Sequence, residues 1–135
     1  MKPMKILFVC HGNAFRSPLA EALLKKIRPD LEVDSAGLHV AIPVSGEVKA
    51  FLSNRNALPY LKETPQSIDE KELKRYDVIV VMEQVQANAV LGACPECKVR
   101  IIAWNIEDPY FLARDDAENI FLQIENKVKE LAKSV

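Results

Sequence analysis

The chain has 135 residues, of which 49% are hydrophobic and 27% charged, as expected of one ordinary globular domain rather than a disordered or fibrous chain. Its 18 Lys and Arg oppose 19 Asp and Glu, so the formal net charge is -1 and no long-range field attracts nucleic acid or an anionic membrane. The longest apolar stretches are about five residues, far short of the roughly 20 that cross a bilayer. We therefore expect a soluble, monomeric protein without nucleic-acid or membrane partners.

The cysteine and histidine content argues against a disulfide framework and a metal centre. Cys10, Cys94 and Cys97 are too few for a disulfide scaffold, and their odd number leaves at least one thiol free. This cysteine usage favours the reducing cytoplasm. Cys94 and Cys97 are the one close pair among the possible zinc ligands, so we expect neither a metal nor another cofactor.

The first third of the chain predicts a strand, a helix and a second strand. Residues 5–9 form a continuous apolar run, typical of a strand that is covered on both faces of a parallel sheet. After a glycine-bearing turn, apolar residues at helical spacing predict a helix that ends before Pro29. Residues 31–33 predict a second strand that enters a turn at 34–37, and a right-handed crossover would pair it parallel to the first.

The rest of the chain continues the alternation. Ser45 predicts the cap of a helix over 45–58, and Ser67 the cap of a short helix over 69–75. Residues 77–82 are rich in β-branched side chains and predict a buried strand. A helix over 83–93, a strand over 99–104 and an amphipathic helix over 115–133 follow, the last burying Ile120, Ile124, Val128 and Leu131.

This order of elements predicts one α/β domain over residues 1–135, in which helices flank a doubly wound, four-stranded parallel sheet. No change of composition, linker or repeat divides the chain. In such sheets ligands bind beyond the carboxyl ends of the strands. The loops that begin at Cys10, Asp34, Glu83 and Asn105 gather there, and the chemistry is expected among them.

The loop after the first strand has the residues of a phosphate-binding site. Between Cys10 and Arg16, Gly12 and Asn13 tolerate the left-handed backbone angles that aim several N–H groups and a helix N-terminus at one anion. The Arg16 guanidinium offers a planar fork for two phosphoryl oxygens. The same positive potential favours the Cys10 thiolate, and Ser17 can donate a hydrogen bond to that sulfur. The alternative is an inert buried cysteine near a surface arginine.

Attack of a cysteine on a phosphomonoester needs an acid that protonates the leaving oxygen. Asp108 is the candidate, because it follows the fourth predicted strand and so reaches the same sheet edge as Cys10. Pro109 stiffens the turn that presents it. Glu107 is the rival carboxylate, and an Asp before Pro is more often simply a turn former.

Four motifs together resemble the low-molecular-weight protein tyrosine phosphatase family: V-C-H-G-N-A-F-R-S-P-L-A-E-A, D-S-A-G, V-V-M-E and E-D-P-Y. The resemblance implies metal-free hydrolysis of a phosphotyrosine protein or aryl phosphate through a cysteinyl-phosphate intermediate. It makes Cys10 the nucleophile, Arg16 the transition-state clamp, and Asp108 the general acid and then base. Backbone N–H groups complete the phosphate-binding loop, those of His11, Gly12, Asn13, Ala14, Phe15 and Ser17.

The same resemblance implies a support network and a substrate wall. Asn13, Ser17 and Ser35 form the hydrogen-bond network that holds the loop in shape. Tyr110 and Phe111 form part of the wall against the substrate's ring, where stacking favours an aryl leaving group. Ordinary core packing of these two aromatic side chains is the alternative.

The chain departs from the family pattern at three places. Phe15 replaces the second cysteine that many members have before the arginine, so a neighbouring disulfide cannot protect Cys10 from over-oxidation. Residues 61–68 lack the histidine that steadies the loop asparagine, which leaves the support of Asn13 open. The loop after residue 37 lacks an aromatic wall residue, and its substitutes would be Leu38, His39 and Ile42.

Two other functions use a similar fold and loop. Thioredoxin-coupled arsenate reductases pass oxidation from the first cysteine to two others, and here Cys94 and Cys97 are a possible redox pair, or else simply a stabilising disulfide. Two observations argue against a reductase. Cys94 and Cys97 are closer together in the sequence than the corresponding cysteines of those reductases, and Tyr110 follows the Asp-Pro pair as it does in the phosphatases. A non-catalytic phosphocysteine carrier is the other alternative, but an acid such as Asp108 would speed loss of the phosphate that a carrier must keep.

Overall fold

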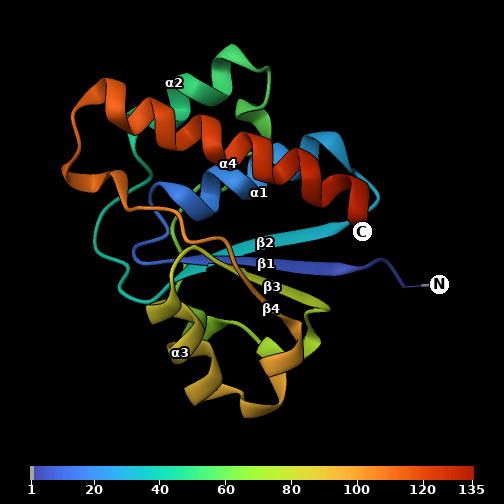
Figure 1. The fold of residues 1–135 in the computed structure, drawn as a ribbon. Helices are drawn as coiled ribbons and strands as arrows, with labels where there is room; N and C mark the ends of the chain where they lie inside the picture. The colour runs from blue at the N-terminus through green and yellow to red at the C-terminus, as the bar shows by residue number, and fades with distance from the viewer. Residues whose placement is uncertain (1) are drawn as a thin grey trace.

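The computed structural model describes residues 2–135, except for the side chains of Phe111 and Arg114. Four parallel strands form one sheet in the order β2-β1-β3-β4 (Figure 1). The strands are β1 (Lys5–Cys10), β2 (Glu32–Gly37), β3 (Val78–Val81) and β4 (Ile101–Ala103). The predicted α/β fold with a four-stranded parallel sheet is confirmed.

Helices cover both faces of the sheet. Figure 1 shows α1 (Arg16–Ile27), α2 (Gly46–Asn54) and α4 (Arg114–Ser134) on one face, and α3 (Gln84–Ala93) on the other. Because both faces are covered, β1 and β3 have almost no polar side chain, which is the reason for their continuous apolar runs. Within residues 2–135, no helix combines the length and the apolar character that crossing a membrane requires.

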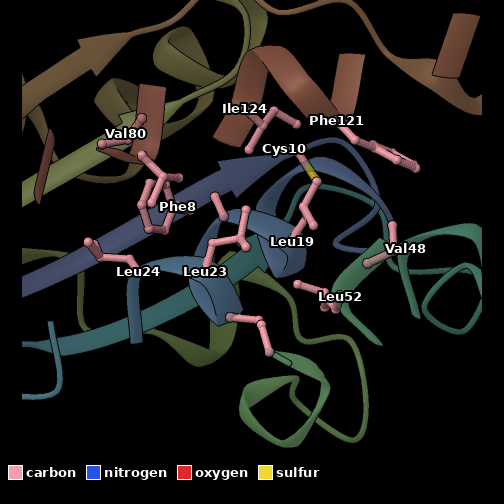
Figure 2. Packing of buried hydrophobic residues seen from close by; sticks show 14 of the residues in the cluster. Phe8, Cys10, Leu19, Leu23, Leu24, Val48, Leu52, Val80, Phe121 and Ile124 are labelled. Carbon is pink, nitrogen blue, oxygen red and sulfur yellow. The ribbon is translucent and has the colours of Figure 1, made fainter. Parts of the chain in front are cut away.

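The alternation of side chains along β1 divides the core in two. Phe8 and Cys10 point into the cluster under α1, α2 and α4, whereas Leu7 and Val9 point into the cluster on the α3 face. Figure 2 shows side chains from β1, α1, α2 and α4 meeting in the first cluster, with Ile124 of α4 among them. Cys10 is thus the last residue of a strand that packing holds on both sides.

The second strand is longer than predicted. Residues 34–37 were expected in a turn, but they belong to β2 and pair with β1, from Leu7 opposite Asp34 to Cys10 opposite Gly37. Asp and Gly favour turns locally, yet the edge of β1 offers backbone partners that outweigh this preference. The pairing brings Gly37 directly beside the start of the phosphate loop.

Three other predicted boundaries were wrong. The helix predicted over 45–58 ends at Asn54, and Asn56 adopts a left-handed φ of 56° that terminates it. The helix predicted over 69–75 is two separate 3₁₀ turns, Ile68–Glu70 and Leu73–Arg75. The fourth strand begins only at Ile101, because a 3₁₀ helix occupies the residues before it and leaves Val99 92% exposed.

Replacing Ile124 by Ala should lower the free energy of unfolding by about 2 to 5 kcal/mol, because the side chain is fully buried in the first cluster. The matched control is Leu122→Ala on the same helix, where the side chain is 40% exposed and the expected loss is below about 1 kcal/mol. Urea denaturation of both variants measures the difference. Equal losses would contradict the docking of α4 on this cluster.

Candidate active site

The loop between β1 and α1 curls around the start of the helix. Asn13 alone among its residues has a left-handed backbone, with a φ of 53°. Gly12 was expected to share this conformation, but no glycine of the described chain has a positive φ. The N-terminus of α1 has neither a side-chain cap nor an acidic residue in its first turn. Its positive end is therefore available to an anion.

The side chain of Asn13 ties the loop to its surroundings. Its amide nitrogen donates to Ser17 Oγ at 2.8 Å and to Ser35 Oγ at 2.9 Å. Its oxygen accepts from the backbone N–H of Gln66 at 2.8 Å. All three polar side chains are fully buried. The structure thus brings together Asn13, Ser17 and Ser35, the residues expected to support the loop.

Lys62 takes the place where the family pattern has a histidine. Its ammonium donates to Asn13 Oδ1 at 3.0 Å and to the carbonyl of Ser35 at 2.7 Å, and its side chain is only 8% exposed. Burial lowers the pKa of Lys62, while the nearby carboxylates of Glu21 and Asp34 oppose that shift. Lys62 was not expected as a site residue. Its one sequence signal is a cation in the segment that lacks the histidine.

The Cys10 thiol is free and lies at the bottom of the site. Its side chain is 2% exposed, and its sulfur lies 2.9 Å from Ser17 Oγ. Cys10 belongs to the first core cluster and also lines the pocket, so the pocket gives access to this residue. This position suits a nucleophile whose sulfur faces an anion bound in the loop.

Arg16 is buried and is held by three residues from two segments, the turn after β3 and the loop after β4. Its Nη1 donates to Glu83 Oε1 at 2.5 Å and to the carbonyl of Ile106 at 2.7 Å, and its Nη2 lies 3.4 Å from Asp108 Oδ2. The guanidinium is 1% exposed, so these partners fix its plane. Glu83 was missed as a site residue, although it directly follows β3, where the sheet edge was expected to gather functional groups.

Asp108 reaches the same site from the loop after β4. One carboxylate oxygen faces Arg16, and the other accepts the backbone N–H of Tyr110 at 3.0 Å, which caps the 3₁₀ helix Pro109–Phe111. Asp108 is therefore both a turn former and a pocket residue. Its side chain is 38% exposed, so a proton can exchange with solvent. Glu107, the rival carboxylate, is not among the described residues that line the pocket.

These groups open into one pocket with a volume of about 260 Å³. Tyr110 meets Phe15 edge to face at a centroid distance of 5.9 Å and forms an aromatic wall with it. The His39 ring also lines the pocket and lies 5.3 Å from the ring of His11. The described lining residues are Cys10, His11, Gly12, Ala14, Phe15, Arg16, His39, Ala41, Ile42, Asp108 and Tyr110.

One expected wall residue, Leu38, is not among the described residues that line the pocket. Leu38 packs against the second core cluster, on the α3 side of the sheet, because it continues β2 with its side chain turned away from the pocket. The side chain of Phe111 lies outside the described part of the structure. Ala41 was not anticipated as a lining residue, and nothing in its sequence context marks it.

Cys94 and Cys97 are joined in a disulfide. Both are buried in the second core cluster, whereas Cys10 belongs to the first. The sheet therefore lies between this pair and Cys10. In the described residues, no group of three or more His, Cys, Asp or Glu side chains is arranged to hold a metal ion.

Together, the fold and the site define an α/β protein with a cysteine-centred phosphate loop at the carboxyl end of its sheet. The chain belongs to the low molecular weight phosphotyrosine protein phosphatase family, whose model matches residues 5–135. It is accordingly an enzyme, a phosphatase of this family.

Known relatives agree with this assignment. The chain is 31% identical to the low molecular weight protein-tyrosine-phosphatase Wzb of Salmonella typhi, over 97% of this chain and 93% of the relative. It is 37% identical to the phosphatase Ptp of Acinetobacter johnsonii over 82% of each chain. The structure of Vibrio vulnificus Wzb in complex with benzylphosphonate superimposes with a TM-score of 0.85 at 26% identity, covering 98% of this chain and 99% of that one.

Gly37→Ala should lower kcat/KM by about 10²-fold, because a misplaced phosphate loop costs about that much. An added Cβ would lie 2.6 Å from the backbone nitrogen of Asn13 and 2.7 Å from the carbonyl carbon of Gly12, neither of which can move alone. In the matched control Gly46→Ala, the new Cβ meets nothing within 4 Å, and the rate should not change. Hydrolysis of p-nitrophenyl phosphate measures both, and an unchanged rate in Gly37→Ala would refute the close approach.

Proposed function

We propose that the chain hydrolyses phosphotyrosine in proteins, without a metal or other cofactor, through a phosphocysteine intermediate. One observation carries the proposal: Cys10, Arg16 and Asp108 come from two distant parts of the chain and line the same pocket. A thiolate, a buried guanidinium and a carboxylate are the groups that such a two-step hydrolysis requires.

In the first step, the Cys10 thiolate attacks phosphorus in line with the leaving oxygen. Arg16 holds two of the equatorial oxygens, and the loop N–H groups and the N-terminus of α1 bind the rest of the charge. Asp108 donates its proton to the phenolic oxygen as the P–O bond breaks. The products of this step are the free phenol and a phosphoryl group bonded to sulfur.

In the second step, Asp108 has lost its proton and acts as a base. It takes a proton from a water molecule, whose oxygen attacks phosphorus as the S–P bond breaks. Ser17, 2.9 Å from the sulfur, stabilises the departing Cys10 thiolate. Inorganic phosphate leaves, and both Cys10 and Asp108 return to their starting states.

The walls of the pocket support an aryl substrate. The rings of Phe15, Tyr110 and His39 all line the pocket, where they can pack against the ring of an aryl phosphate. The related Vibrio vulnificus enzyme was solved with benzylphosphonate, in which an aromatic ring is attached to a phosphonate group. The relatives named protein-tyrosine-phosphatases point to the same substrate class.

The arrangement of the cysteines does not support arsenate reduction. Cys94 and Cys97 are buried in the second core cluster, so transfer of oxidation from Cys10 would need the sheet to open. A phosphocysteine carrier is equally disfavoured, because Asp108 lines the pocket where it would promote hydrolysis of the phosphocysteine.

The purified protein should release p-nitrophenol from p-nitrophenyl phosphate in EDTA, and Cys10→Ser should abolish turnover, because a serine hydroxyl is a far weaker nucleophile than a thiolate at neutral pH. Arsenate with thioredoxin is run in parallel. Oxidation of thioredoxin on addition of arsenate, with no release of phosphate, would overturn the proposal in favour of the reductase.

Asp108→Asn should lower kcat by about 10² to 10⁴-fold for phenyl phosphate, whose phenolate is a poor leaving group. The loss for p-nitrophenyl phosphate should be much smaller. The reason is that p-nitrophenolate departs without a proton. Glu107→Gln is the matched control, since it removes the neighbouring carboxylate outside the pocket. Equal losses on both substrates in Asp108→Asn would show that Asp108 is not the acid.

A further inference from the structure

We propose that Lys62 is a positioning residue for catalysis, whose buried ammonium fixes a one-way chain of hydrogen bonds through Asn13 and Ser17 that ends as a donor to the Cys10 sulfur. The inference rests on the proposed role of Cys10 as nucleophile. It adds a residue that acts through two others without touching the substrate.

The position of Lys62 is unusual for a lysine. It follows the 3₁₀ helix Leu58–Tyr60, and its ammonium lies beneath the phosphate loop with the side chain 8% exposed. A buried ammonium is costly unless it is paired and hydrogen-bonded. Lys62 meets that demand with two hydrogen bonds, to Asn13 Oδ1 and to the carbonyl of Ser35.

The first link of the chain fixes the Asn13 amide. An ammonium carries three donors and no acceptor, so the atom of Asn13 that faces Lys62 at 3.0 Å must be the oxygen. The backbone N–H of Gln66, also only a donor, lies 2.8 Å from the same atom. With two donors on its oxygen side, the amide nitrogen must face the two serines.

The second link orients the serine hydroxyls. Asn13 Nδ2 donates to Ser17 Oγ, so the hydroxyl hydrogen of Ser17 points to another acceptor. Its neighbours are Cys10 Sγ at 2.9 Å and the carbonyl of Ala36 at 3.4 Å. The Cys10 thiolate has no hydrogen and can only accept, so in the reactive form Ser17 donates to the sulfur. A hydrogen bond to a charged thiolate is stronger than one to a neutral thiol, so this donor favours the reactive form.

The hydroxyl of Ser35 is oriented in the same way as that of Ser17. Ser35 Oγ accepts from Asn13 Nδ2 and donates to Glu21 Oε1 at 2.5 Å. Turning the Asn13 amide over would place its nitrogen against Lys62 and its oxygen against both serines. Lys62 and the N–H of Gln66 oppose that rotation together, but of these two donors only Lys62 is a side chain that substitution can remove.

The charged groups around Lys62 come from three other parts of the chain. Glu21 and Lys25 are on α1, Asp34 is on β2, and Lys71 follows the 3₁₀ turn capped by Ser67. Lys62 lies 3.8 Å from both carboxylates, while Lys25 pairs with Glu21 and Lys71 with Asp34. Lys25 and Lys71 therefore make the close ion pairs with the two carboxylates. Lys62 instead directs its hydrogen bonds at Asn13 and Ser35.

The test is the pH dependence of the rate at which iodoacetamide alkylates Cys10, followed by the mass of the intact protein. Cys10 is the free thiol, because Cys94 and Cys97 are bonded to each other. Lys62→Met keeps the length of the side chain but has neither charge nor donor. In this variant we expect the midpoint of alkylation to rise by about one pH unit, which corresponds to a tenfold lower thiolate fraction below the midpoint. The acidic limb of kcat/KM should move with it. Lys62→Arg, which keeps a charged donor, should restore both profiles at least in part.

Lys71→Met is the matched control. Lys71 is as buried as Lys62 and binds Asp34 at 2.6 Å in the same charged cluster, but its ammonium donates to Asp34 and Gln66 rather than to Asn13. It should therefore lose stability without moving the alkylation midpoint. Equal midpoints in wild type and Lys62→Met, or equal shifts in Lys62→Met and Lys71→Met, would overturn the proposal.

Two further arms keep the result interpretable. If circular dichroism shows that Lys62→Met does not fold, Lys62→Leu replaces it, because Leu also lacks a charge and a donor, with the same expected rise and the same overturning result. Alkylation of Cys10 is measured without a phosphate substrate. A shifted midpoint together with full activity of Cys10→Ser would therefore refute the proposed function, whereas an unshifted midpoint with inactive Cys10→Ser would refute only the role of Lys62.

Discussion

The side-chain amide of Asn13 is the point on which the site depends. It makes four hydrogen bonds in a space closed to solvent, to Ser17, Ser35, Lys62 and the backbone of Gln66. These bonds hold a residue whose own backbone is left-handed, a conformation that an L-residue adopts at some cost. The curl of the phosphate loop, and with it the direction of the loop N–H groups, is therefore maintained from below by side chains that the substrate never touches.

The guanidinium of Arg16 is held in place by other contacts than those that hold the phosphate loop. It is buried between the carboxylates of Glu83 and Asp108 and the carbonyl of Ile106, which hold its plane before any anion arrives. A phosphate dianion then meets an arginine that has little rotational freedom left to lose. Because Asp108 Oδ2 lies 3.4 Å from this cation, one contact positions both the carboxylate that we propose as the acid and the guanidinium that we propose as the clamp for the phosphoryl group.

The sheet separates the candidate active site from the disulfide. Cys10 ends β1 on the face covered by α1, α2 and α4, and the disulfide between Cys94 and Cys97 lies in the cluster on the face covered by α3 (Figure 1). Two sets of cysteines in one small chain thus belong to different environments. One thiol lines the pocket of the site, while the bonded pair is buried in the second core cluster.

Periodicity and local motifs determined the order of strands and helices, the parallel sheet and the loop from Cys10 to Arg16, because apolar spacing and turn residues act over short stretches of chain. The extension of β2 to Gly37, the contact of Arg16 with Glu83 and the burial of Lys62 were decided only by the tertiary structure. Each joins segments far apart in the sequence. Lys62 shows the reason: nothing local makes a lysine favourable inside a protein, and its place is stable only because the folded chain brings Asn13, Glu21 and Asp34 around it.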